Sequence, residues 1–395
     1  MIRAKLPRQP HLRTSYSPAM EPLRLLFVID FLGTGGAQRQ MVTLALAMRR
    51  RGHSVDFFCY HESKFYLEAL RDADINLYCH PKSWRFSPRP LWDLRQRMKQ
   101  GDYDLVLSFL PVPNLYSTLA RLGMRKQPKL VISERSGEKG RSKFTPLYRY
   151  SDHTTVNSYH MREFYCRIIP WIEGRIDTIW NGVDLDAFQA TPLPVRNGEL
   201  RLLGIGNVAK YKNWRCIIEA LAILRDQYGL RPKFDHVGQI TNLSPKNHVC
   251  LSEMNHAIER LDLGDQWHTM GQRSDMPEVI SCHHALIHPS YLEGLPNAIC
   301  ESLACGRPVI AGDTLDHPRL VQDGQTGFLF DWTSPEDLAK AIHRLSECGD
   351  SEWVEMSTAA RRFAEAELSV EIFADRYEAL FRRLTSIGKH ESSPT

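Results

Sequence analysis

The segment 23–36, LRLLFVIDFLGTGG, decides the fold. Its first eight residues, Leu23 to Asp30, form an apolar run with the length and composition of a buried strand. The glycine loop Gly33-Thr34-Gly35-Gly36 follows, and apolar residues then recur at helical spacing up to a stop at Gly52. A second strand pattern occupies 54–58. A strand–helix–strand unit of this kind is typical of a parallel, doubly wound sheet.

The same alternation continues along the chain. Further strand patterns lie at 105–108, 130–133, 176–180, 202–206, 285–288 and 309–311. A polar, proline-containing stretch at 189–199 interrupts them and is typical of a linker. We therefore predict an α/β protein with two Rossmann-like, doubly wound domains that face each other across a cleft. The predicted divisions are a basic, disordered tail (1–22), an N-terminal domain (23–190), a C-terminal domain (200–370) and a C-terminal helix (371–395).

Length and composition limit the class of protein. A chain of 395 residues favours two domains, and 43% hydrophobic with 24% charged residues is ordinary for a globular protein and excludes a disordered or fibrous one. No apolar run approaches the roughly 18 residues of a spanning helix. The nine cysteines are scattered without a C-x-x-C pair, which argues against a disulfide framework and favours a cytoplasmic location.

Charge is divided unequally between the two halves. Residues 1–190 hold 29 Lys/Arg and 18 Asp/Glu, a net +11, whereas residues 191–395 hold 21 and 28, a net −7. A basic half favours nucleic acid, anionic lipid or a phosphorylated substrate as partner, and a solvated surface without a partner is the alternative.

One basic segment is also rich in aromatic residues. Residues 82–99 contain six Lys/Arg against a single acid, Asp93, and three aromatic side chains lie among them, Trp84, Phe86 and Trp92. This mixture favours an anionic membrane surface or a lipid-diphosphate acceptor. A solvated loop and helix with aromatic residues in the core is the alternative.

The glycine loop at 33–36 lacks the full G-x-G-x-x-G spacing, and no acid follows at the distance of a dinucleotide-binding fingerprint. Gly35 and Gly36 nevertheless allow a ligand to approach the backbone closely, at the free N–H groups of the helix that follows. A tight turn without a ligand is the alternative interpretation.

The strongest candidate site follows the strand at 285–288 and reads Glu293-Gly294-Leu295-Pro296-Asn297-Ala298-Ile299-Cys300-Glu301. Pro296 suits the first position of a helix, so free N–H groups should point to the carboxyl end of the strand and form an anion site. Two acids beside an anion site suit sugar hydroxyls that flank a diphosphate. The alternative is a helix whose acids complement its dipole. Cys282-His283-His284 is interpreted as a packed turn, and no metal site is expected.

This E-x7-E pattern with its Gly-Leu-Pro insert resembles the signature of retaining glycosyltransferases of the GT-B fold, family four. Four other motifs agree in order and place: Gly35-Gly36-Ala37, Asn181-Gly182-Val183-Asp184, the loop from Gly206 to Lys212-Asn213, and Thr326-Gly327-Phe328-Leu329. The resemblance covers about 23–385. It implies a GT-B architecture in which the C-terminal domain holds a nucleotide-diphosphate sugar and the N-terminal domain holds the acceptor. The final helix would cross back to the first domain, and a surface helix of the second domain is the alternative.

The resemblance also implies roles for single residues. The catalytic residues would be Glu293, at the donor sugar hydroxyls, and Lys212, at the diphosphate leaving group. Glu301 would bind the ribose. The other expected donor contacts are Gly35, Gly36, Asn207, Gln272, Arg273, Gly294, Leu295, Pro296 and Asn297, and the expected acceptor contacts are Glu134 and Arg135. The implied enzyme is a hexosyl- or N-acetylhexosaminyltransferase that retains anomeric configuration and needs neither a metal nor another cofactor.

Two departures from the family pattern stand out. Asn207 occupies the position five residues before Lys212 where many relatives carry Arg, and residues 107–114 lack the His found in many relatives. The absence of this His is similar to the pattern in a branch of the family found among bacterial polysaccharide and glycan-assembly enzymes. We therefore expect a glycan, lipid-linked or polysaccharide acceptor, a cytoplasmic protein associated with the inner face of the membrane, and no nucleic acid partner. A nucleotide-sugar epimerase and a non-catalytic two-lobe binding protein are the competing hypotheses.

Overall fold

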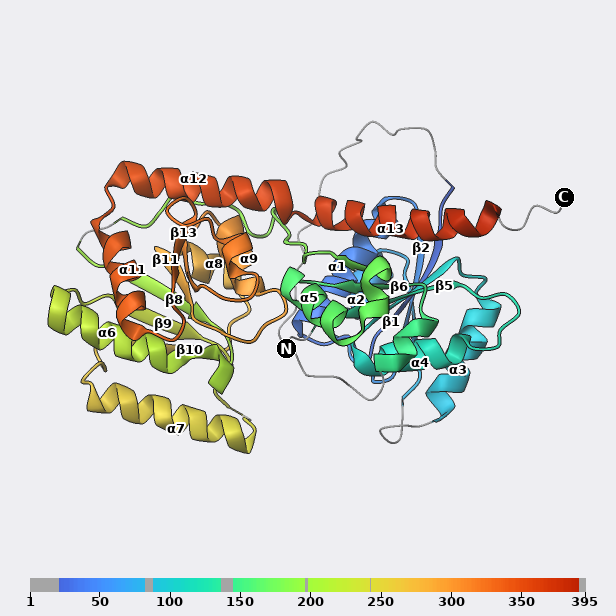
Figure 1. The fold of residues 1–395 in the computed structure, drawn as a ribbon, viewed down its shortest axis with the longest axis horizontal. Coiled ribbons are helices and arrows are strands. Elements are labelled where there is room, and N and C mark those ends of the chain that lie inside the picture. Colours follow the sequence, from blue (N-terminus) through green and yellow to red (C-terminus); the bar gives the residue numbers. More distant parts are fainter. Residues whose placement is uncertain (1–20, 82–87, 136–144, 196–197, 242, 391–395) are drawn as a thin grey trace. The chain divides into compact units, whose positions relative to one another are not determined.

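The structure is a computed structural model that describes residues 21–81, 88–135, 145–195, 198–241 and 243–390. The chain forms two compact units (Figure 1). Unit 1 comprises Met1–Gly182 and Val370–Thr395, and unit 2 comprises Val183–Ser369. Residues 1–20 of the predicted tail and residues 82–87 of the basic segment lie outside the described residues.

Unit 1 contains a seven-stranded sheet in the order β3-β2-β1-β4-β5-β6-β7, with every neighbouring pair parallel. Its strands are β1 (Arg24–Val28), β2 (Ser54–Cys59), β3 (Asn76–Cys79), β4 (Leu105–Phe109), β5 (Lys129–Glu134), β6 (His153–Val156) and β7 (Ile176–Thr178). Its α-helices are α1 (Gly36–Arg50), α2 (Leu67–Asp72), α3 (Pro88–Gln100), α4 (Pro111–Arg121), α5 (Tyr159–Ile168) and α13 (Val370–His390).

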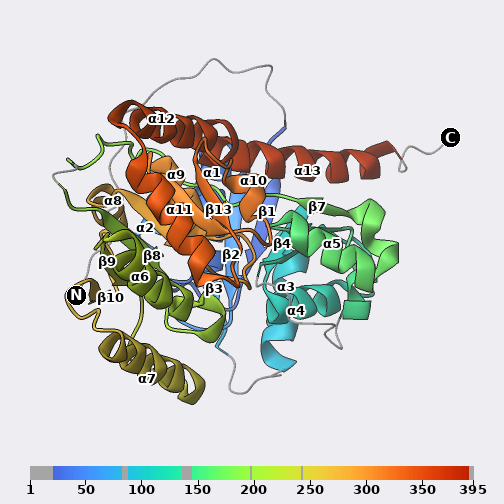
Figure 2. The ribbon, with the colours of Figure 1, turned by 60° about the vertical axis from the view of Figure 1, so that its left-hand side comes forward.

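Strand β1 shows why the apolar run folds as it does. Leu25 and Phe27 pack into a core with α1 and α13, whereas Leu26 and Val28 pack into a second core with α3, α4 and α5. A strand buried on both faces must be apolar at every position. Helices α3 and α4 lie side by side in both views (Figures 1 and 2).

Helix α13 belongs to unit 1, although it is the last helix of the chain. It packs against α1 and contributes Phe373, Tyr377 and Phe381 to the core. Its Glu378 carboxylate accepts a hydrogen bond from Arg51 Nη1 at 2.9 Å. Helix α13 therefore covers the same face of the sheet as α1.

Unit 2 contains a six-stranded parallel sheet in the order β10-β9-β8-β11-β12-β13. Its strands are β8 (Arg201–Ile205), β9 (Lys233–Val237), β10 (Trp267–Gly271), β11 (Ala285–His288), β12 (Val309–Gly312) and β13 (Gly327–Phe330). Its α-helices are α6 (Trp214–Tyr228), α7 (Pro245–Arg260), α8 (Met276–Ser281), α9 (Asn297–Ala304), α10 (His317–Leu320), α11 (Pro335–Glu347) and α12 (Asp350–Glu367).

Both units are doubly wound, which confirms the predicted class of two Rossmann-like α/β domains. In each sheet the strand order reverses direction beside the first strand, between β1 and β4 in unit 1 and between β8 and β11 in unit 2. Doubly wound sheets bind ligands at the carboxyl ends of the strands that flank this reversal. The carboxyl ends of β8 and β11 therefore mark the first place to look for a site in unit 2.

Candidate functional site

Two loops meet at the carboxyl ends of β8 and β11. The first runs from Gly206 through a short 3-10 helix, Lys210–Lys212, and the second runs from Pro289 to the start of α9. The carbonyl oxygen of Tyr211 accepts hydrogen bonds from Ser290 Oγ and from the Tyr291 N–H, both at 3.1 Å. These bonds fix the two loops to each other.

The contact between the loops brings Lys212 and Glu293 together. Lys212 Nζ donates a hydrogen bond to Glu293 Oε1 and forms an ion pair with it. Ser290 Oγ, whose single proton is shared with the Tyr211 carbonyl, lies 3.1 Å from the same glutamate oxygen. Both charged side chains are largely buried, at 15% and 18% exposed. A side chain at Gly206, where φ is +157°, would place its Cβ 3.0 Å from Lys212 Cε, so glycine leaves room for the lysine.

A pair of histidines lies beneath this ion pair. His288 Nε2 is 3.8 Å from Glu293 Oε1, and the His288 and His317 rings lie 5.2 Å apart. Burial lowers the pKa of His288 well below its usual value, and His317 and Lys212 lower it further. Burial likewise lowers the pKa of His317, whose Nδ1 donates to the Gly312 carbonyl at 2.8 Å. The floor of the site is therefore neutral, and Lys212 and Glu293 supply its charge.

These neutral rings predict a pH-dependent stability of the protein. In the unfolded chain each histidine has a pKa of about 6.5. Burial lowers the pKa of His236, His288 and His317 in the folded state, so the unfolded chain binds more protons below pH 6.5. This contribution to stability is complete above pH 6.5 and is lost as the pH falls from there toward the lowered pKa values of the folded protein. Urea unfolding at pH 7.5 and 5.5 should show the loss.

A matched pair of variants tests the cause of that pH dependence. His317→Gln should reduce the slope of unfolding free energy against pH, since it removes one buried titrating group. His256→Gln changes an exposed histidine of the same unit and should leave the slope as it is. Equal slopes in both variants would contradict the assignment to buried histidines.

The remaining residues of the E-x7-E motif surround the start of α9. The helix begins at Asn297 and Pro296 is its N-cap, so the helix starts one residue later than predicted. The difference arises because Pro296 has ψ of 102°, an extended conformation, so the helix starts only after it. Gly294, Leu295 and Pro296 are buried, Asn297 is partly exposed, and Glu301 lies one turn inside the helix at 5% exposed.

The structure places three other predicted donor contacts around the same sheet. Asn207 Oδ1 accepts a hydrogen bond from the Gln239 N–H at 2.9 Å, which ties the loop after β8 to the loop after β9. Gln272 and Arg273 follow β10, the edge strand, which β9 separates from β8. Arg273 Nε donates to Asp275 Oδ1 at 2.8 Å. Gln272 and Arg273 thus follow a strand that is not adjacent to β8 or β11, and their donor contacts stay a prediction.

Gly35 and Gly36 lie in unit 1, at the start of α1. Gly35 is the N-cap, and a Cβ there would lie 2.2 Å from Gln38 Oε1. Gln38 Nε2 in turn donates to Asp30 Oδ1 at 3.3 Å. The glycine loop is thus packed closely around the carboxyl end of β1, and its ligand contact stays a prediction.

Glu134 and Arg135 follow β5 and are both buried. Glu134 Oε1 accepts hydrogen bonds from Asn114 Nδ2 at 3.0 Å and from the Tyr148 hydroxyl. Burial and the Glu134 carboxylate raise the pKa of Tyr148, which keeps this hydroxyl a donor. These bonds fix the carboxylate inside unit 1.

Arg135 joins β5 to two distant segments of unit 1. Its Nη2 donates to the Tyr377 hydroxyl at 2.9 Å, its Nη1 donates to Asn181 Oδ1, and its guanidinium lies 4.1 Å from the centre of the Phe109 ring. These contacts give Arg135 an internal bridging position, and an acceptor role for Glu134 and Arg135 stays a prediction.

Sequence reasoning missed the polar residues that support the ion pair. Ser290 and His288 stand two residues apart at the end of β11, in the stretch His288-Pro289-Ser290. The sequence carries a signal for these two residues: they are polar and stand where a buried strand ends, at the edge of the sheet that binds ligands. His317 carries no comparable signal, because α10 brings it to the site from another part of the chain.

No cluster of three or more His, Cys, Asp or Glu side chains that could hold a metal ion occurs in the described ranges. His283 instead lies between Asp235 Oδ2 and the Val279 carbonyl, both at 2.7 Å. His284 Nδ1 accepts a hydrogen bond from the Arg201 N–H at 3.0 Å. Within the same described ranges, no helix has both the length and the apolar character needed to cross a membrane.

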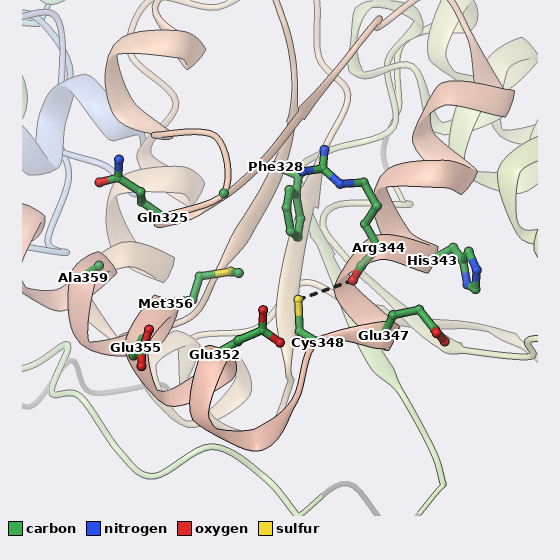
Figure 3. Close-up of a pocket in the computed structure, with 11 residues that line it drawn as sticks. Gln325, Phe328, His343, Arg344, Glu347, Cys348, Glu352, Glu355, Met356 and Ala359 are labelled. Atoms are coloured by element: carbon green, nitrogen blue, oxygen red, sulfur yellow. Dashed lines mark hydrogen bonds between the residues drawn. The ribbon is translucent and has the colours of Figure 1, made fainter.

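A separate hollow of unit 2 lies among β13, α11 and α12 (Figure 3). Its volume is about 780 Å³, and Glu347, Glu352 and Glu355 line it. The Arg344 guanidinium lies 4.3 Å from the centre of the Phe328 ring. None of the predicted site residues lines this hollow, so it is distinct from the Lys212–Glu293 site.

The chain thus has two doubly wound units, with a lysine–glutamate pair at the switch point of the second. Comparison with known families agrees over most of the chain. Residues 34–187 match the profile of Glycosyltransferase Family 4, and residues 199–348 match that of Glycosyl transferases group 1. The chain belongs to the family-4 type of GT-B glycosyltransferases.

Curated relatives and solved structures extend the comparison. The D-inositol 3-phosphate glycosyltransferase of Paenarthrobacter aurescens is 30% identical over 185 residues, which span 43% of this chain and 43% of that protein. An α-1,4-N-acetyl-D-galactosaminyltransferase of Campylobacter jejuni, which acts on a PP-undecaprenol-linked glycan, is 33% identical over 124 residues, or 29% and 33% of the two chains. The chain thus matches less than half the length of either relative.

Solved structures share the fold along almost the whole chain. A glycosyltransferase from Rickettsia africae superposes with a TM-score of 0.80 at 18% identity and covers 92% of this chain and 99% of its own. The Anabaena protein Alr3699/HepE, solved in complex with UDP and glucose, superposes with a TM-score of 0.76 at 19% identity, and the match covers 91% of this chain and 99% of that protein. At such low identity, the likeness establishes the GT-B fold.

Proposed function

We propose that the protein is a retaining, metal-independent glycosyltransferase that moves a sugar from a nucleoside diphosphate sugar to a glycan, lipid-linked or polysaccharide acceptor. The observation that carries this proposal is the meeting of Lys212 and Glu293 at the carboxyl ends of β8 and β11, directly before the start of α9. A cation, a carboxylate and the N-terminus of a helix in one place suit a diphosphate attached to a sugar.

Each group has a distinct task in the transfer. The bond between the anomeric carbon and the diphosphate oxygen breaks, and negative charge develops on the departing oxygen. The Lys212 ammonium and the N–H groups at the start of α9 stabilise that charge. The acceptor hydroxyl attacks from the same face, and its proton passes to the leaving phosphate. Glu293 accepts hydrogen bonds from the sugar hydroxyls and holds the ring in place.

The ion pair also implies a rearrangement when the donor binds. Lys212 and Glu293 neutralise each other in this structure. A donor diphosphate would attract Lys212 and the sugar hydroxyls would donate to Glu293, so the donor replaces the contact between the two side chains. Without a donor, the ion pair thus compensates the two buried charges.

The comparisons suggest which substrates to try first. A solved structure of the same fold contains UDP and glucose, and another contains UDP-glucose. The name of one curated relative gives a PP-undecaprenol-linked glycan as its acceptor. We therefore propose a uridine diphosphate sugar as donor and a polyprenyl-diphosphate-linked glycan as the first acceptor to test.

The proposed mechanism predicts two properties of the reaction. Transfer should continue at an unchanged rate after treatment with EDTA, because the charge of the leaving group is met by Lys212 and α9. The new glycosidic bond should keep the anomeric configuration of the donor. Proton NMR of the product reports the configuration, and an inverted product would refute the retaining mechanism. Conversion of the donor sugar without any acceptor would instead indicate an epimerase.

We further propose that unit 1 meets the inner face of an anionic membrane. Helix α3 exposes Trp92 at 61% and the Arg89 side chain at 86%. Basic and aromatic side chains together favour the headgroup region of anionic lipids. We expect binding to anionic vesicles that weakens as salt rises, and a several-fold loss in the double variant Arg89→Gln/Trp92→Ala. Equal binding to neutral vesicles, or none at low salt, would contradict this.

A further inference from the structure

A second concave site lies in unit 1, far along the chain from the catalytic residues. It is a cavity of about 560 Å³ formed by β7, the first turns of α5, and α13. Strand β7 is the outermost strand of its sheet. Three arginines line the cavity, Arg162 from α5 and Arg376 and Arg383 from α13, together with Asp177 and Thr178 of β7.

The cavity carries an excess of positive charge. Asp177 is the one acid among its lining residues. Arg383 Nη2 donates to Asp177 Oδ2 at 2.6 Å, and His153 Nε2 lies 3.0 Å from the same oxygen. Hydrogen bonding from His153 and Arg383 lowers the pKa of Asp177 to about 2, so it remains ionised. Asp177 therefore pairs with Arg383, one of the three arginines that line the cavity.

Arg162 has unused hydrogen-bonding capacity. Its Nε donates a long bond of 3.4 Å to the Ile176 carbonyl. Within the described part of the chain, its two terminal nitrogens make no hydrogen bond or ion pair. Since a guanidinium presents its terminal donors as a planar fork, Arg162 is suited to bind a phosphate through two parallel bonds.

The apolar part of the wall also suits a bound molecule. Ile179 and Leu380 form apolar parts of the wall, and Tyr159 contributes a ring that is 41% exposed. The cavity therefore pairs charged donors with surfaces that can cover an organic ring, and its volume lies within the range of small-molecule sites.

We propose that this cavity binds a small soluble molecule that carries a phosphate or diphosphate group, with Arg162 as the principal phosphate ligand. The site is independent of Lys212 and Glu293, because every residue that lines it belongs to unit 1. Arg376 and Thr178 line the same cavity.

The test is calorimetric titration of the full chain with inorganic pyrophosphate at low salt. The Lys212→Gln variant serves as the starting protein, so that a diphosphate bound in unit 2 does not contribute. We expect one saturable site per chain, and a dissociation constant raised about 10-fold or more by adding Arg162→Gln, since one charge-assisted interaction is lost. Arg376→Gln is a second probe, and thermal unfolding confirms that each variant is folded.

The matched control is Arg125→Gln, which changes an exposed arginine of unit 1 outside the cavity. It should leave the dissociation constant unchanged. No saturable binding, or an equal loss in Arg125→Gln and Arg162→Gln, would overturn the proposal. Arg162-dependent binding to phosphatidate-containing vesicles without binding of pyrophosphate would assign the cavity to a lipid headgroup and overturn the soluble ligand.

Discussion

Lys212→Gln is expected to lower kcat/KM for sugar transfer by about 10²- to 10³-fold, the usual loss when one preorganised donor to a developing negative charge is removed. Glutamine keeps a similar reach and a hydrogen-bond donor but brings no charge. The leaving diphosphate would then rely on the N–H groups at the start of α9. Steady-state kinetics with a uridine diphosphate sugar measures the loss.

Lys210→Gln is the matched control for this prediction. Lys210 stands in the same 3-10 helix as Lys212 but is exposed, whereas the Lys212 side chain is 15% exposed and directed to Glu293. We expect less than about a threefold change for Lys210→Gln, since exposed charges are screened by water and salt. A larger loss for Lys210→Gln than for Lys212→Gln would transfer the phosphate role to Lys210.

The fold was predictable because burial on both faces forces a recognisable pattern. Strand β1 is apolar at each position from Leu25 to Val28, and its alternate residues pack into two different cores. Helix α6 (Trp214–Tyr228) is followed by Gly229 in the left-handed conformation, the usual residue at a helix end. Local physical chemistry is sufficient for such elements.

The site was predictable only in part, because its assembly depends on contacts between distant segments. The pairing of Lys212 with Glu293 follows from the adjacency of β8 and β11, and strand order is not written in the local sequence. Arg135 shows the same limit. Its contact with Tyr377 joins residues 242 positions apart, so the sequence around Arg135 could not indicate that α13 covers it.

The two glutamates of the E-x7-E motif should respond differently to substitution, because their positions give them different tasks. Glu293 precedes α9 and contacts Lys212, at the place proposed for the reacting sugar. Its hydrogen bonds strengthen as the sugar gains positive charge, so they act in the transition state. Glu293→Gln should lower kcat by about 10²-fold or more, if a charged hydrogen bond of about 3 kcal/mol is lost.

Glu301 is buried one turn inside α9 and is proposed to hold the ribose, which does not change during the reaction. Glu301→Gln should therefore raise the donor KM and weaken binding of free UDP, with a smaller effect on kcat. Glu293→Gln should leave UDP binding equal or tighter, because it frees Lys212 from its ion pair and lets the ammonium meet the diphosphate. Kinetics and calorimetry on both variants separate the two roles. If Glu293→Gln weakens UDP as much as Glu301→Gln does, the sugar and ribose assignments are wrong, and if neither variant slows turnover, the reaction takes place elsewhere in the protein.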